Sequence, residues 1–236
     1  MANPAYNERA LRRLRTIEDT SRMTIEGTIN RTGILLLLLM GGGVFGWNMH
    51  SSLLLIGGLI LNLILAFLII FDPKKAAYLS QPYALAEGVL LGSISSVYAA
   101  AYPGIITNAM LLTVAVFALM LGLYRFRIIK VTDRVRSVIV SATLAIAVVY
   151  FINLIMGFFG TSMPMIHQSG TYGIIFSIVV VGVAAFNLLL DFDFIERASQ
   201  SGAGKFMEWY GAFALVLTIV WLYLEILRLL SKLNKK

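Results

Sequence analysis

The feature that most constrains this chain is a series of long apolar segments joined by short connections. A helix that crosses a bilayer needs about 20 mostly apolar residues, because each residue rises about 1.5 Å. Seven segments approach or reach this length: 33–49, 51–71, 82–102, 104–124, 137–159, 172–192 and 209–230. Only 13% of the residues are charged, whereas soluble domains carry about 25%. The sequence therefore predicts an all-α integral membrane protein, a compact bundle of seven transmembrane helices.

Three regions follow from this pattern. Residues 1–32 form a polar, basic N-terminal segment, residues 33–230 the transmembrane domain, and residues 231–236 a basic tail. The N-terminal segment has neither the early apolar core nor the small-residue cleavage site of a signal peptide. Its LRRLRTI stretch favours either contact with anionic membrane lipid or docking on a protein partner, and both alternatives stay open.

The positions of lysine and arginine predict the orientation. The N-terminal segment and every second connection carry Lys or Arg, and the remaining three connections carry neither. Basic residues in short loops mark the cytoplasmic side, so we expect a cytoplasmic N-terminus. The same rule accounts for the net charge of +7 without a nucleic-acid partner. Seven spans would place the C-terminus outside, yet four basic residues lie there: Arg228, Lys232, Lys235 and Lys236.

Carboxylates inside the spans are the candidate functional groups, because each intramembrane charge costs at least ~2.5–3.5 kcal/mol on insertion scales. Glu87 lies about one and a half turns into the third span, and Asp191 lies in the last turn of the sixth. Both fall near the predicted cytoplasmic end and would meet if these two spans are neighbours. Asn187 lies one turn before Asp191 on the same helical face. We expect a carboxylate cluster at the inner mouth of the bundle, with Asp193 beside it.

Such a cluster suits cations and protons. Carboxylate oxygens bind hard cations such as Ca²⁺. Clustered carboxylates also take up protons more easily, because burial and like charge both raise a carboxyl pKa. Asp191 and Glu87 are therefore the predicted Ca²⁺ ligands and pH sensors, with Arg22 or Arg31 as a latch that competes for Asp191. The ordinary alternative is that Asp191 and Asp193 end a helix at the interface and pair with arginine.

Glu225 and Arg228 are three residues apart in the last span, so they can pair along one helix. We expect a structural ion pair, and a role at the outer end of a permeation path is the alternative. No lysine falls within the seven predicted spans, which excludes a retinal-type Schiff base. The chain has no cysteine and lacks the GxSxG, HExxH, Walker A and GxGxxG motifs, so we expect neither an enzyme nor a cofactor.

Glycines suggest how the helices pack. Gly88 and Gly92 form a GxxxG pattern, which lets helix backbones approach closely, and we expect it to act within the bundle. The run Gly41–Gly43 is a candidate for the broken helix that a transporter of organic solutes needs near the middle of the membrane. Solute transport therefore stays open as a third function.

Several stretches resemble the Bax inhibitor-1 family. DFDFIER at the end of the sixth span resembles the family's (Y/F)D-x-x-x-I element, and YALAEGVLLGSIS resembles its EG-x-x-LG-x-x-S element. MTIEGTINRTGILLLLL and the closing EWYGAFALVLTIVWLYLEILRLLSKL are similar to a bacterial branch with an extended N-terminus. The resemblance implies a seven-helix fold in which six helices surround the last one. It also implies pH-sensitive calcium leak, in which an aspartate in the sixth span and one in the seventh form the pH sensor.

Asp191 matches the first aspartate of that sensor, whereas Thr218 stands at the second position. The expected function is therefore a pH-sensitive leak of cations, Ca²⁺ above all, closed by protonation of carboxylates. Some bacterial relatives restrain a membrane-anchored AAA+ protease, so the alternative is a non-transporting regulator of such a complex. The absence of a signal peptide, the short loops and the family branch predict a bacterial inner membrane.

Overall fold

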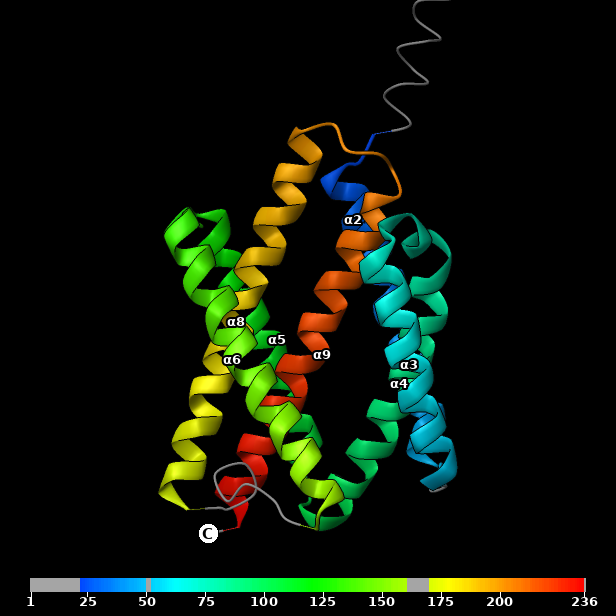
Figure 1. Ribbon diagram of the computed structural model, residues 1–236, viewed down its shortest axis with the longest axis vertical. Coiled ribbons are helices and arrows are strands. Elements are labelled where there is room, and N and C mark those ends of the chain that lie inside the picture. The colour runs from blue at the N-terminus through cyan, green and yellow to red at the C-terminus, as the bar shows by residue number, and fades with distance from the viewer. Residues whose placement is uncertain (1–21, 50–51, 161–169, 236) are drawn as a thin grey trace, which may run out of the picture.

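The computed structural model describes residues 22–49, 52–160 and 170–235, and Figure 1 shows their arrangement. The expected all-α bundle is confirmed. Its helices are α2 (Ile25–Trp47), α3 (Ser52–Phe71), the short 3-10 helix η1 (Pro73–Lys75), α4 (Ala76–Ala101), α5 (Ile105–Arg125), α6 (Asp133–Phe158), α8 (Thr171–Gln200) and α9 (Met207–Asn234). Most of the predicted N-terminal segment, residues 1–21, lies outside the described residues.

Six of these helices are long and apolar enough to cross a membrane. The other, α3, is 20 residues long and apolar over Leu55–Phe71. Several helices extend beyond the predicted apolar segments, because hydropathy marks the membrane core and not the helix ends. For example, α2 begins at Ile25 rather than at residue 33. Thr24 caps it: its side-chain oxygen accepts a hydrogen bond from the Gly27 N–H, and Glu26 lies in the first turn.

The last helix, α9, lies at the centre of the bundle, as the family resemblance implied. It packs against α2, α4, α5 and α8, and in Figure 1 it runs between α5, α6 and α8 on one side and α2, α3 and α4 on the other. Val216, Leu222 and Leu227 of α9 are fully buried. Lipid tails are as apolar as leucine, so close van der Waals packing, and not escape from water, stabilises this core.

The connections that carry basic residues lie at one end of the bundle. Figure 1 shows the start of α2 and the α3–α4, α5–α6 and α8–α9 connections together at its upper end. The α4–α5 connection and the end of α9 lie at the opposite end. This is the arrangement that the positive-inside rule requires if the upper end is cytoplasmic.

The closest helix contact joins α2 to α4 through glycines. A methyl group added to Gly88 would overlap the carbonyl oxygen of Leu39, and one added to Gly92 would overlap that of Gly43. Ser93 strengthens the contact, since its hydroxyl donates to the Gly46 carbonyl at 2.8 Å. The GxxxG pattern therefore packs within the bundle, as expected. Because α2 runs unbroken through Gly41–Gly43, these glycines do not form the broken helix of a solute transporter.

We predict that Gly88→Ala destabilises the protein by at least about 2 kcal/mol, because α2 and α4 must separate to admit the methyl group. Gly33→Ala on α2 is the matched control, since nothing lies within 4 Å of a Cβ added there. Reversible unfolding in mixed micelles, followed by circular dichroism, measures both. Equal stabilities for the two variants would contradict the close approach.

Candidate ion-pathway site

Asp191 lies in the second half of α8 (Thr171–Gln200), on the side that meets α9. Its Oδ2 atom is buried and has no hydrogen-bond partner among the described residues. Thr218 of α9 is the polar side chain within hydrogen-bonding reach of this carboxyl group. The position at which this chain departs from the two-aspartate pattern thus lies directly opposite Asp191. The contact between α8 and α9 holds one carboxylate and one hydroxyl in place of two carboxylates.

Asn187 contributes to the packing of α8 on α6. Its side-chain amide donates to the Thr143 hydroxyl of α6 at 2.8 Å and to the Val183 carbonyl at 2.8 Å. It lies one turn from Asp191 on α8, as predicted, but its amide group donates hydrogen bonds to these two residues and not to Asp191. Its place in the structure is therefore that of a helix-packing residue beside the site.

The structure does not bring Glu87 to Asp191. Glu87 of α4 accepts a hydrogen bond at 2.8 Å from the amide of Asn62 on α3. In Figure 1, α9 lies between α4 and α8. The expected cluster required α4 and α8 to be neighbours, and the central helix separates them. The sequence predicted how far along its helix each carboxylate lies, but it did not predict which helix each carboxylate faces.

The two predicted ligands do not make a resident Ca²⁺ site. Across residues 22–49, 52–160 and 170–235, no three His, Asp or Glu side chains come close enough to hold a metal ion. Calcium takes about 6–8 oxygen ligands, and Asp191 with Thr218 supplies far fewer. A cation at this site would be cargo in transit.

Asp193 holds the α5–α6 region against α8. It is buried and forms ion pairs with Arg136 of α6 at 2.6 Å and with Arg197, one turn along α8, at 2.8 Å. The sequence offered two interpretations of this residue, a carboxylate of the path or a helix-end partner of arginine. The two guanidinium partners favour the structural interpretation.

Glu196 has a similar position one turn further along α8. It accepts hydrogen bonds from the Tyr124 hydroxyl at the end of α5 and from Arg127 at 2.6 Å. Gln200 adds a third donor at 3.2 Å. The three carboxylates of DFDFIER therefore divide into two roles: Asp191 faces α9, and the other two attach α5 and α6 to α8.

Arg31, one of the two predicted latch residues, is held by a carboxylate that was not among the predicted site residues. It forms an ion pair with Glu208 in the first turn of α9 and lies 5.2 Å above the Trp209 ring. Glu208 is 1% exposed and also accepts hydrogen bonds from the N–H and the hydroxyl of Thr24, at 2.9 and 3.0 Å. Arg31 is therefore not the partner of Asp191. The only sequence signal for Glu208 was its place in the first turn of an apolar helix.

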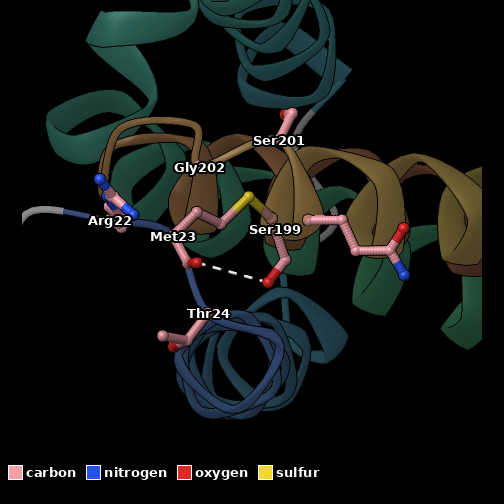
Figure 2. Close-up of a pocket in the computed structure, with 7 residues that line it drawn as sticks. Arg22, Met23, Thr24, Ser199, Ser201 and Gly202 are labelled. Atoms are coloured by element: carbon pink, nitrogen blue, oxygen red, sulfur yellow. Dashed lines mark hydrogen bonds between the residues drawn. The ribbon is translucent and has the colours of Figure 1, made fainter. Parts of the chain in front are cut away.

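Arg22 lies in a short strap, residues 22–24, that crosses the α8–α9 connection. Arg22 pairs with Gly204 in an antiparallel bridge, and the Met23 N–H donates to the Ala203 carbonyl at 2.7 Å. Figure 2 shows the strap, the Ser199 hydroxyl donating to the Met23 carbonyl, and the residues around a cavity of about 370 Å³. Ser199 is about 12 Å along α8 from Asp191. The structure therefore places Arg22 at the surface, away from Asp191.

A second polar cluster lies in the half of α9 farthest from the strap. The expected Glu225–Arg228 ion pair is confirmed, with an N–O distance of 2.8 Å. Glu225 is 1% exposed and also accepts hydrogen bonds from Tyr150 of α6 at 2.9 Å and from Trp221 at 3.3 Å. The Arg228 guanidinium lies 5.0 Å above the Tyr150 ring. These contacts attach α9 to α6.

Lys232 lies just beyond the predicted seventh span, yet the structure places it inside the bundle. It is 3% exposed, and its ammonium group donates to the Gly173 carbonyl at 2.9 Å and to the Ser177 hydroxyl at 2.8 Å. The predicted end of this helix at residue 230 was too early, because α9 continues to Asn234. Arg228 and Lys232 thus have hydrogen-bond partners within the bundle. Because both belong to a helix and not to a loop, neither counts toward the positive-inside rule that predicts the orientation.

We predict that Glu225→Gln lowers the free energy of unfolding by about 2 kcal/mol, because it leaves the Arg228 guanidinium without its counter-charge. The cost is below the 3–5 kcal/mol typical of fully buried pairs, since the Arg228 side chain is 32% exposed. The double variant Glu225→Gln/Arg228→Met should recover part of the loss. Glu26→Gln, in the exposed first turn of α2, is the control. Its free energy of unfolding should lie within about 0.5 kcal/mol of that of the unmodified protein. Unfolding in mixed micelles checks all three, and equal losses in Glu225→Gln and Glu26→Gln would contradict the assignment.

Comparison with known proteins agrees with the architecture. A family model described as "Bax inhibitor 1 like" matches residues 3–235. A comparison with curated proteins finds no match. The matched range includes the seven long helices that the structure describes, the carboxylate at the α8–α9 contact and the Glu225–Arg228 pair of α9. The chain therefore belongs to the Bax inhibitor-1-like family.

Proposed function

We propose that this protein passes cations, Ca²⁺ above all, across its membrane, and that protonation of Asp191 closes the path. The observation that carries the proposal is the buried Oδ2 atom of Asp191, which has no hydrogen-bond donor among the described residues. A buried carboxylate oxygen without a partner is costly, so this oxygen needs a proton or a cation to satisfy it. Competition between a proton and a cation for one oxygen is the basis of the proposed gate.

Thr218 is the polar partner of Asp191 in this mechanism. Its hydroxyl can donate to an ionised Asp191 and can accept from a protonated one, so it can contact Asp191 in both states. The two states differ in charge: an ionised Asp191 attracts a passing cation, and a protonated Asp191 does not. A ligand or proton shifts two states only by its differential affinity for them. Here the differential is the negative charge, which a cation binds and a proton removes.

The proposal revises the latch suggested by the sequence. Glu208 already engages Arg31, and Arg22 lies in the surface strap. The polar partner of Asp191 is therefore the Thr218 hydroxyl and not an arginine. The family resemblance supports the proposed activity, since members are associated with pH-sensitive calcium leak.

We predict that Asp191→Asn flattens the pH dependence of Ca²⁺ flux. The measurement is Ca²⁺ entry into proteoliposomes loaded with a fluorescent indicator, between about pH 6 and about pH 8. The unmodified protein should pass more Ca²⁺ at the higher pH. In the variant, the flux at the higher pH divided by the flux at the lower pH should be within about twofold of one, because an amide does not titrate in this range.

Two variants serve as controls for this measurement. Asp72→Asn makes the same change on the half-buried α3–α4 connection and should keep the pH dependence. Glu87→Gln tests whether the path includes the α3–α4 contact, and we expect it to keep the pH dependence too. An unchanged pH profile in Asp191→Asn would contradict the gate. No flux above empty liposomes at any pH would contradict transport itself and favour the non-transporting regulator of a membrane-anchored protease.

We further predict that Thr218→Asp keeps the path closed to a higher pH than in the unmodified protein. Two facing carboxyl groups share one proton and hold it more tightly than a single group does. Thr218→Asn is the control, since it has similar volume without the charge. The same flux assay measures both variants, and identical profiles would show that position 218 does not act on Asp191.

A further inference from the structure

A second cavity, of about 240 Å³, lies between the end of α5, the α5–α6 connection and the end of α8. Three cationic side chains line it: Arg127 and Lys130 from the connection and Arg197 from α8. Two carboxylates, Asp193 and Glu196, line it as well. Its location is the end of the bundle at which the basic connections gather (Figure 1).

The carboxylates of this cavity are already neutralised. Glu196 pairs with Arg127, and Asp193 pairs with both Arg197 and Arg136. Lys130 is exposed, and its ammonium group makes no hydrogen bond or ion pair with the part of the chain that the structure describes. Four cations therefore surround two carboxylates, and the surplus positive charge attracts an anion.

The backbone conformation of Arg127 follows from the end of α5. Its φ of 57° is the left-handed conformation that commonly follows the C-terminus of a helix. The Arg127 N–H donates to the Tyr124 carbonyl at 3.0 Å, and the Ile128 N–H donates to the Leu123 carbonyl at 3.0 Å. This helix end leads the chain into the connection whose Arg127 and Lys130 line the cavity.

Apolar side chains flank the same cations. Phe126 is 77% exposed and Ile128 is 67% exposed, on either side of Arg127. Exposed aromatic and aliphatic residues beside basic ones at a helix end are typical of segments that lie in the membrane interface. An anion that offers a negative headgroup to the cations and acyl chains to these two residues is an anionic phospholipid.

We propose that this cavity binds the phosphate-bearing headgroup of an anionic phospholipid. Lys130 and Arg127 contact the phosphate oxygens, and Phe126 and Ile128 lie against the upper part of the acyl chains. Basic pockets between transmembrane helices on the cytoplasmic side bind such headgroups. A free phosphate ion would use the same cations but would leave the apolar residues without a partner. The proposal stands independently of ion flux.

The test is lipid binding to the purified full-length protein in a neutral detergent. Short-chain phosphatidylglycerol is titrated, and native mass spectrometry counts the bound lipid. We expect saturable binding that weakens about fivefold in Lys130→Gln, the equivalent of about 1 kcal/mol for one cation at a membrane surface. Lys74→Gln is the matched control, because Lys74 is also an exposed lysine on a connection at the same end. Its affinity should match that of the unmodified protein.

Two further ligands distinguish the sources of the phosphate. Phosphatidylcholine with the same chains should bind at least about fivefold more weakly, since its headgroup has no net charge. Glycerol phosphate should not saturate the site at the concentrations that suffice for the lipid. Equal weakening in Lys130→Gln and Lys74→Gln, unchanged binding in Lys130→Gln, equal binding of phosphatidylcholine, or saturation by glycerol phosphate would each overturn the proposal. Circular dichroism confirms that both variants keep their helices.

Discussion

Inside a bilayer there is no water to satisfy a charge, so each charged side chain of the bundle depends on a partner within the protein. Glu208 finds Arg31, Glu225 finds Arg228, and Lys232 finds the carbonyl and hydroxyl groups of α8. These contacts join α9 to α2, to α6 and to α8. The arrangement of the helices is thus tied together by the need to pair a small number of charges. Asp191 forms no ion pair with the described residues, its Oδ2 atom has no hydrogen-bond partner among them, and the proposed activity depends on this oxygen.

The central helix links the structural and the functional parts of this scheme. One end of α9 is attached to the start of α2 through Glu208, and the other end is attached to α6 and α8 through Glu225, Arg228 and Lys232. Thr218 lies between these two attachments and faces Asp191. The polar contacts at the two ends of α9 therefore limit how far α8 and α9 can move relative to each other at Thr218. A local rearrangement of the α8–α9 contact fits this geometry better than a displacement of the whole helix.

Features that depend on local sequence were predictable, and features that depend on the neighbours of each helix were not. Apolar length predicted the helices, and the three-residue spacing predicted the Glu225–Arg228 pair, because both are properties of one segment. The proximity of Glu87 and Asp191 required a particular helix order, and α9 lies between their helices. Lys232 was placed outside the bundle because hydropathy falls before the helix ends, while its partners belong to α8. The family resemblance supplied what the local pattern lacked, namely the central position of the last helix.

The central position of α9 has a consequence for biosynthesis. The ribosome makes α9 after the six other long helices that the structure describes, so these helices leave the ribosome before their common core exists. Until α9 arrives, Arg31 has no Glu208, and Ser177 has no Lys232. The incomplete bundle must expose polar groups to lipid or shelter them against the insertion machinery, and the arrival of α9 completes the packing. For this chain, synthesis of α9 is the step that supplies the core of the membrane domain.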